Sequence, residues 1–107
     1  MNVLYFAEGQ YGTGFEITCE SEQMHIGDTI KFIIADTQDN RIIEKDYIAE
    51  NINSTTLAVI ITQAESELLK EGIYKWGTEL LRENELRQIL VVEDNIYQGK
   101  LIVRKGV

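Results

Sequence analysis

The sequence predicts an all-β protein, an antiparallel β-sandwich of seven to eight strands with one short helix. Three observations lead to this fold class. Short apolar or alternating segments recur at a spacing of roughly 8 to 15 residues, turn-forming residues separate them, and a single segment carries helix signals. Parallel strands would need a crossover helix between them, so antiparallel pairing is expected. The 107 residues suit one domain, predicted over 1–107.

Three strands are predicted in the first third of the chain. Residues 3–7 form a short apolar segment, and residues 15–19 alternate with period two after a glycine-rich turn. A second turn at 25–28 leads into a strand at 29–35. One face of that strand is predicted to carry Ile30, Phe32 and Ile34.

The middle of the chain predicts a hairpin and a central strand. Residues 36–40 are turn formers and 41–45 resume an extended pattern, so the strands on either side of the turn should pair. The run 57–62 is β-branched and nearly all apolar. That composition is expected of a central strand covered on both faces.

The single helix is predicted by a capping box. The hydroxyl of Thr62 can accept a hydrogen bond from the amide of Glu65, and the Glu65 carboxylate can reach back to the amide of Thr62. Gly72 can adopt the left-handed conformation that stops a helix. Together these signals predict about two turns of helix before the strand that carries Tyr74.

The C-terminal third is predicted to hold the remaining strands. In the segment 73–81, Tyr74 and Trp76 fall on the same side, and this aromatic side is predicted to be buried. Polar turns separate that segment from strands at 86–92 and 100–104.

The passage 62–76 resembles the strand, short helix, Gly-x-Tyr and strand passage of immunoglobulin-like domains, where a tyrosine like Tyr74 bonds back to upstream backbone. The order of motifs resembles more specifically the immunoglobulin-like N-terminal domain of phage baseplate upper proteins. The motifs are a Gly-Asp pair at 27–28 before an apolar strand, Gly72-x-Tyr74, and a closing strand at 99–103. The resemblance implies a phage or prophage structural protein and identifies no catalytic residue.

Charge and composition exclude several functions. Eighteen acidic residues against ten basic ones give a net charge of -8, which disfavours nucleic-acid binding because phosphate affinity comes from Lys and Arg. No signal peptide or membrane-spanning run is visible, so a cytoplasmic protein is expected, which could become associated with virions. Cys19 is the single cysteine, which fits a reducing compartment.

No enzyme, cofactor or metal site is predicted. His25 is best interpreted as a solvated turn residue and Cys19 as a small core residue, since nothing near them completes a catalytic set. The glycines of 9–14 precede a strand, whereas a phosphate-binding loop needs a helix there. Acidic pairs in turns are interpreted as solvated, although their oxygens could bind calcium: Asp36/Asp39, Glu44/Asp46, Glu83/Glu85 and Glu93/Asp94.

The function expected from the sequence is a non-catalytic assembly protein of a phage tail or baseplate that contacts protein partners, the chain itself among them. Four tyrosines are candidate interface anchors, because tyrosine gives contact area at low entropic cost: Tyr5, Tyr11, Tyr47 and Tyr97. Two alternatives stay open. One is a stand-alone carbohydrate-type binding sandwich, and the other is a small acidic inhibitor that imitates nucleic acid.

Overall fold

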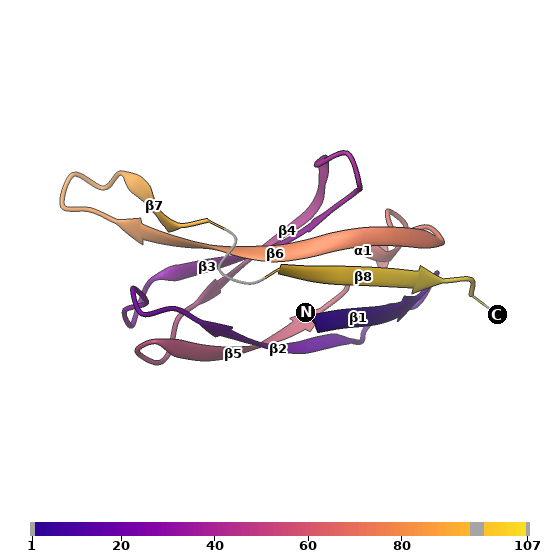
Figure 1. Ribbon diagram of the computed structural model, residues 1–107, viewed down its shortest axis with the longest axis horizontal. Helices are drawn as coiled ribbons and strands as arrows, with labels where there is room; N and C mark the ends of the chain where they lie inside the picture. The colour runs from indigo at the N-terminus through magenta and orange to yellow at the C-terminus, as the bar shows by residue number, and fades with distance from the viewer. Residues whose placement is uncertain (1, 95–97, 107) are drawn as a thin grey trace.

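The computed structural model describes residues 2–94 and 98–106, and it is an all-β structure as predicted. A strand is present in each predicted region, but the strand predicted at 86–92 begins only at Ile89, because residues 84–88 form a turn closed by Asn84. Eight strands and one short helix are found among the described residues (Figure 1): β1 (Asn2–Ala7), β2 (Gly14–Glu20), β3 (Thr29–Ala35), β4 (Arg41–Ile48), β5 (Ser54–Ile60), α1 (Gln63–Ser66), β6 (Gly72–Glu83), β7 (Ile89–Glu93) and β8 (Gln98–Arg104).

The strands form two sheets that pack face to face. The larger sheet has the order β1-β8-β6-β3-β4, with β7 also paired to β6, and the smaller sheet consists of β2 and β5. Figure 1 shows the smaller sheet running beneath the larger one. β3 and β4 form the predicted hairpin, with Ile30 opposite Tyr47.

The prediction of purely antiparallel pairing is wrong for one pair of strands. β1 and β8 are parallel, with Leu4 opposite Leu101 and Phe6 opposite Val103. Parallel neighbours need a long connection, and here nearly the whole chain lies between the first strand and the last. Patterns among neighbouring residues cannot predict this pairing, because the two strands are far apart along the chain.

The core lies between the sheets and uses the predicted faces of β3 and β6. Ile30, Phe32 and Ile34 have no exposed surface, and Trp76 is 2% exposed. The rings of Phe32 and Trp76 stack with their centroids 6.0 Å apart. Aromatic packing at this separation adds to the hydrophobic stabilisation of the two central strands.

The prediction of a central, doubly covered strand at 57–62 is also wrong. β5 pairs only with β2, and its residues alternate between buried and exposed. Leu57 and Val59 face the core, whereas Ile60 on the outer face is 47% exposed. Apolar composition did not distinguish a doubly covered strand from one that presents Thr, Ala and Ile to solvent.

The predicted capping box forms, but the helix it begins is shorter than expected. The Thr62 hydroxyl accepts from the Glu65 amide at 3.2 Å, and the Thr62 amide donates to the Glu65 carboxylate at 2.9 Å. α1 nevertheless ends at Ser66 after four residues. Leu69 is fully buried in the core. The chain leaves the helix after Ser66, and this brings the Leu69 side chain into the core. Gly72 therefore opens β6 and does not stop the helix.

Tyr74 locks the connection between α1 and β6. Its hydroxyl donates to the carbonyl of Lys70 and accepts from the amide of the same residue, both at 3.0 Å. One side chain thus satisfies both the N–H and the C=O of Lys70, which lies in a segment without regular structure. This contact determines where β6 begins.

We expect Tyr74→Phe to lower the free energy of unfolding by about 1 to 2 kcal/mol, since two backbone groups lose their hydrogen-bond partner while the ring stays in place. Denaturant unfolding measures this loss. Tyr11→Phe at an exposed loop position is the matched control and should have little effect. Equal stability of the two variants would contradict the proposed role of the Tyr74 hydroxyl.

Candidate functional site

The β6–β7 hairpin, defined as residues 81–93, projects beyond the end of β3 (Figure 1). β6 pairs with β3 as far as Leu81, which lies opposite Thr29, and it then continues through Glu83 with β7 alone beside it. Figure 1 shows this hairpin projecting from the upper left of the sandwich.

The turn of the hairpin is closed by one asparagine. The Asn84 side-chain oxygen accepts from the amides of Leu86 and Gln88, each at 2.9 Å. The Asn84 amide donates to the Gln88 carbonyl at 3.0 Å, and its carbonyl accepts from the amide of Arg87. Arg87 adopts a left-handed conformation with φ of 59°. These bonds give the tip a defined shape.

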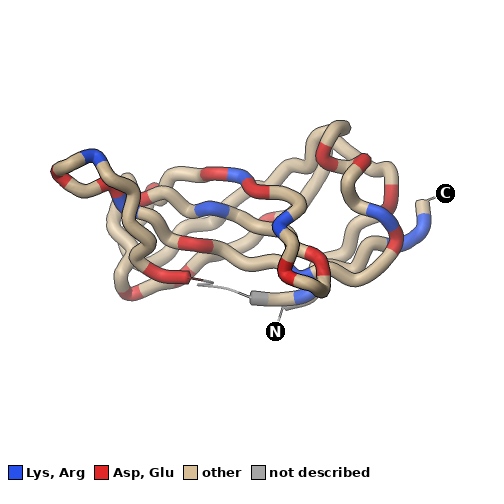
Figure 2. The backbone as a smooth tube through the Cα atoms, turned by 90° about the horizontal axis from the view of Figure 1, so that it is seen from above, with Lys and Arg blue, Asp and Glu red and all other residues tan. Residues whose placement is uncertain are grey.

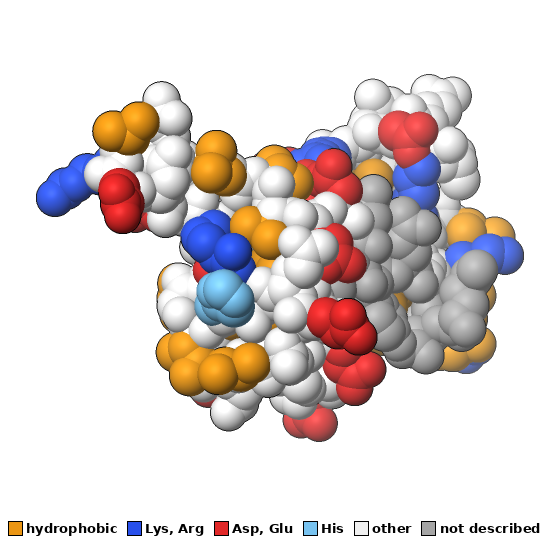
Figure 3. All heavy atoms as spheres, turned by 60° about the vertical axis from the view of Figure 1, so that its left-hand side comes forward, with side chains coloured by type: hydrophobic (Ala, Val, Ile, Leu, Met, Phe, Trp, Pro, Cys, Tyr) orange, Lys and Arg blue, Asp and Glu red, His pale blue; other side chains and the backbone are white. Residues whose placement is uncertain are grey.

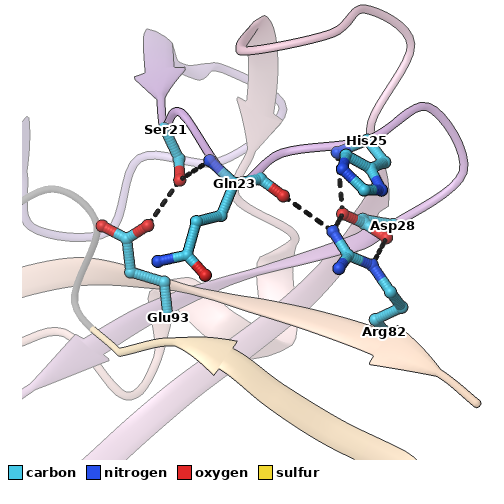
Figure 4. A network of polar contacts seen from close by, with 6 residues as sticks. All are labelled: Ser21, Gln23, His25, Asp28, Arg82 and Glu93. Atoms are coloured by element: carbon cyan, nitrogen blue, oxygen red, sulfur yellow. Dashed lines mark hydrogen bonds and ion pairs between the residues drawn. The ribbon is translucent and has the colours of Figure 1, made fainter.

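Arg82 anchors the base of the hairpin to the loop between β2 and β3 (Figure 4). Its guanidinium donates to both carboxylate oxygens of Asp28, at 2.9 and 2.7 Å, and to the carbonyl of Gln23 at 2.7 Å. Asp28 is 4% exposed, so this forked ion pair is largely shielded from water on the carboxylate side. The hydrogen bond from Arg82 lowers the pKa of Asp28 below its ordinary value.

A second contact anchors the other strand of the hairpin to the same loop. The Ser21 hydroxyl donates to the carboxylate of Glu93 and accepts from the amide of Gln23 at 3.1 Å. Figure 4 shows the two anchors side by side, with Glu93 and Arg82 reaching toward the loop from β7 and β6. Both strands of the hairpin are thus tied to one loop.

The hairpin presents apolar side chains to solvent. Leu86 is 77% exposed, Ile89 61%, Leu90 48% and Val91 55%. Figure 3 looks toward this end and shows hydrophobic side chains on the projecting lobe at upper left. Scattered exposed apolar residues are normal, but here four occur within six residues of one projecting element, with Ile89 and Val91 on one face of β7 and Leu90 on the other.

The opposite edge of the larger sheet has a different character. β4 carries Arg41, Glu44, Lys45 and Asp46 along its length. Arg41 donates to Glu44 at 3.1 Å and to the carboxylate of Glu79 at 2.8 Å. Charges on an edge strand prevent it from pairing with another chain. β4 is protected in this way, whereas β7 has one charged residue, at its last position.

The tyrosines predicted as interface anchors do not gather on the hairpin. Tyr5 and Tyr11 are exposed, at 54% and 55%, and the Arg104 guanidinium lies 4.5 Å from the Tyr5 ring centre. Figure 1 places the connection after β1, which carries Tyr11, at the end opposite the hairpin. Tyr47 is half-buried and packs against the core. Tyr97 lies outside the described residues.

Sequence reasoning missed the hairpin as a site, although a signal for it was present. Residues 89–92 read Ile-Leu-Val-Val without a charge, directly after a polar turn. In the sequence this run is indistinguishable from a core strand. Only the exposure of Ile89, Leu90 and Val91, which the tertiary structure reveals, makes part of this run a candidate contact surface.

The remaining candidate residues lie in structural positions. Cys19 is fully buried, and its thiol donates to the Thr78 hydroxyl at 3.7 Å. His25 lies exposed in a turn, where its amide donates to Asp28 at 2.9 Å. Gly14 opens β2, and a Cβ atom there would overlap the backbone of Val59. That glycine is needed for the close approach of β2 to β5, and the segment after it is the predicted strand.

The acidic residues and one shallow pocket are the other features that could bind a ligand. Within 2–94 and 98–106, no group of three or more His, Cys, Asp or Glu side chains is arranged to hold a metal ion. Figure 2 shows acidic residues distributed over loops and strands along the molecule. A shallow pocket of about 220 Å³ near α1 carries both signs of charge and is lined by Glu8, Gly9, Tyr11, Gln63, Ser66, Glu67 and Lys70.

Comparison of the chain with protein-family models, with curated proteins and with solved structures finds no match. Among the described residues, no helix is both long and apolar enough to span a membrane.

We expect Asp28→Asn to lower the free energy of unfolding by about 2 kcal/mol at neutral pH, because a forked, charge-assisted pair becomes a neutral contact. The folded-state pKa of Asp28 lies below its unfolded value of 3.8, so its contribution is complete above that value and is lost as pH falls through the folded pKa. The difference between wild type and variant should therefore shrink in acid.

Denaturant unfolding from about pH 7 to about pH 2.5 measures this difference across the titration of Asp28. Hydrogen exchange at residues 81–83 should accelerate in the variant, since these amides lie at the base of the hairpin. Asp46→Asn is the control, because Asp46 forms an exposed ion pair with Lys31. A difference that does not change with pH would contradict the assigned role of the Asp28 carboxylate.

Proposed function

We propose that this chain is a non-catalytic structural or assembly protein of a phage or prophage tail or baseplate, and that it works through protein contacts made by the β6–β7 hairpin. The observation that carries the proposal is the exposed apolar surface of Leu86, Ile89, Leu90 and Val91 on a hairpin that projects from the sandwich. Apolar surface of this kind gains free energy when a partner removes it from water.

The two anchors support a binding role because they hold the hairpin in place before a partner arrives. Arg82 and Glu93 connect its two strands to the loop at 21–28, and Asn84 shapes its tip. A contact surface that is already ordered loses little conformational entropy on binding. The hairpin is therefore suited to assembly, where many copies must fit in one geometry.

The finer part of the proposal is that the sandwich is immunoglobulin-like. Its support is the tyrosine in 62–76, where Tyr74 bonds back to Lys70 four residues upstream, together with two sheets packed face to face. The order of motifs in the sequence supports the relation to phage baseplate upper proteins.

The alternatives have less support. A carbohydrate-binding sandwich would use an aromatic platform, and the ring of Trp76 is buried against Phe32. An acidic inhibitor would gather its carboxylates at phosphate-like spacing on one face, whereas the described acidic residues are dispersed (Figure 2). The hairpin favours neither of these functions.

The test is incorporation into particles. In cells that produce the phage structures encoded with this chain, wild-type protein should sediment with tail particles. We expect the double variant Leu86→Ser/Ile89→Thr to lose at least about tenfold of this incorporation, a change equivalent to about 1.4 kcal/mol of contact energy. Its thermal stability should stay close to wild type, because both side chains are exposed.

The matched control is Ile48→Thr/Ile52→Ser, which removes two apolar side chains that are 60% and 62% exposed and lie outside the hairpin. This control should incorporate like wild type. Wild-type protein that stays free of all particles would overturn the proposed function. Equal incorporation of the hairpin variant and wild type would show that the hairpin is not the contact surface.

A further inference from the structure

The outer edge of β7 is unpaired among the described strands. β7 pairs with β6 on one side, and β8, which follows it along β6, is covered by β1. An unpaired edge presents backbone N–H and C=O groups that can bond to a strand of another chain. The geometry of the hairpin determines which residues of β7 turn these backbone groups toward the free edge.

The ladder between β6 and β7 determines that geometry. The Asn84 amide bonds to the Gln88 carbonyl, so these two residues form a hydrogen-bonded pair. In an antiparallel ladder, bonded and non-bonded pairs alternate. Arg82 and Leu90, two positions further, are thus a bonded pair, and the backbone groups of Leu90 turn toward β6. Those of Ile89 and Val91 turn to the free edge.

This arrangement is self-complementary. When two β7 strands are placed antiparallel around a two-fold axis at Leu90, Ile89 of one copy lies opposite Val91 of the other. Both residues turn their backbone groups outward, so each such pair can exchange two hydrogen bonds. The two Leu90 side chains meet at the axis as a non-bonded pair, where side chains approach most closely.

The charges of the hairpin agree with the same register. With Leu90 at the axis, the residues that face each other run from Gln88 to Val92, and none of them is charged. The hairpin holds two arginines and three glutamates, whereas the whole chain carries a net charge of -8. Two copies therefore bring no like charges face to face along the paired strands.

We propose that the occupant of the β7 edge is a second copy of this chain, and that the two β7 strands pair antiparallel with Leu90 at the two-fold axis. The inference rests on the proposed function, since it names the partner of the hairpin. A closed two-fold contact of this kind uses the same surface on both copies. It joins two larger sheets into one continuous sheet.

The dimer is expected to be weak. Pairing of two five-residue strands covers less than the roughly 800 Å² per partner that a standard stable interface buries. We therefore expect a monomer at about 10 µM and a growing dimer fraction toward about 1 mM, the range of a weak contact. Light scattering and sedimentation velocity of the full chain measure this change in mass.

The decisive substitution is Val91→Pro. Proline removes the outward N–H of Val91 and leaves the ladder with β6 intact, because that amide takes no part in it. We expect this variant to stay monomeric at every concentration. Val91→Thr keeps the amide and a β-branched side chain, so it is the matched control and should still dimerise. Circular dichroism and a thermal melt establish that both variants fold.

Charges placed at the axis test the register without proline. Leu90→Asp and Leu90→Lys should each weaken self-association by about fivefold or more, since two like charges then meet at the two-fold axis. A mixture of the two variants brings opposite charges together there and should associate more tightly than either variant alone. A mixture no tighter than its components would overturn the register centred on Leu90.

The outcomes separate this inference from the proposed function. Wild-type protein that is monomeric up to about 1 mM would overturn the second copy as the occupant. If Leu86→Ser/Ile89→Thr still prevented entry into particles, the assembly function would stand with a different partner on the hairpin. A dimer that Val91→Pro leaves unchanged would place self-association on another surface and would also overturn the inference.

Discussion

The structure depends on the unequal lengths of its two central strands. β6 has twelve residues and β3 has seven, and only the paired part of β6 lies over the core. Over that part, Trp76 and Leu80 are buried against Phe32 and its neighbours. Beyond Leu81 the strand has no neighbour in β3, and the residues of β7 that pair with this end of β6, Ile89 to Val91, are exposed. The projecting hairpin is a direct consequence of this mismatch.

A hairpin of two strands is at best marginally stable in water by itself, so its defined position needs contacts outside its own ladder. Arg82 and Glu93 provide them through Asp28 and Ser21. Because Asp28 is almost completely buried, its charge is compensated mainly by the Arg82 guanidinium, and each depends on the other for its position. The polar loop at 21–28 thereby determines how an apolar surface is presented, which connects the sandwich to the proposed assembly role.

Two of the edge strands of the larger sheet, β4 and β7, differ in how they are protected. β4 is protected by charged side chains that bond to one another and to β6, whereas β7 presents Ile, Leu and Val. An unprotected apolar edge carries a risk of aggregation. The net charge of -8 opposes uncontrolled association of copies of the chain.

The sequence by itself determined the features that depend on neighbouring residues: the strands, the buried face of β3 and β6, the capping box at Thr62 and Glu65, and the burial of Cys19. These follow from periodicity and from hydrogen bonds within a few residues. Only the tertiary structure decided the parallel pairing of β1 with β8, the exposed face of β5, the one-turn helix, and the candidate site on the hairpin. The physical reason is that an apolar strand has the same local pattern whether or not another layer covers it, and the covering layer comes from residues distant in the chain.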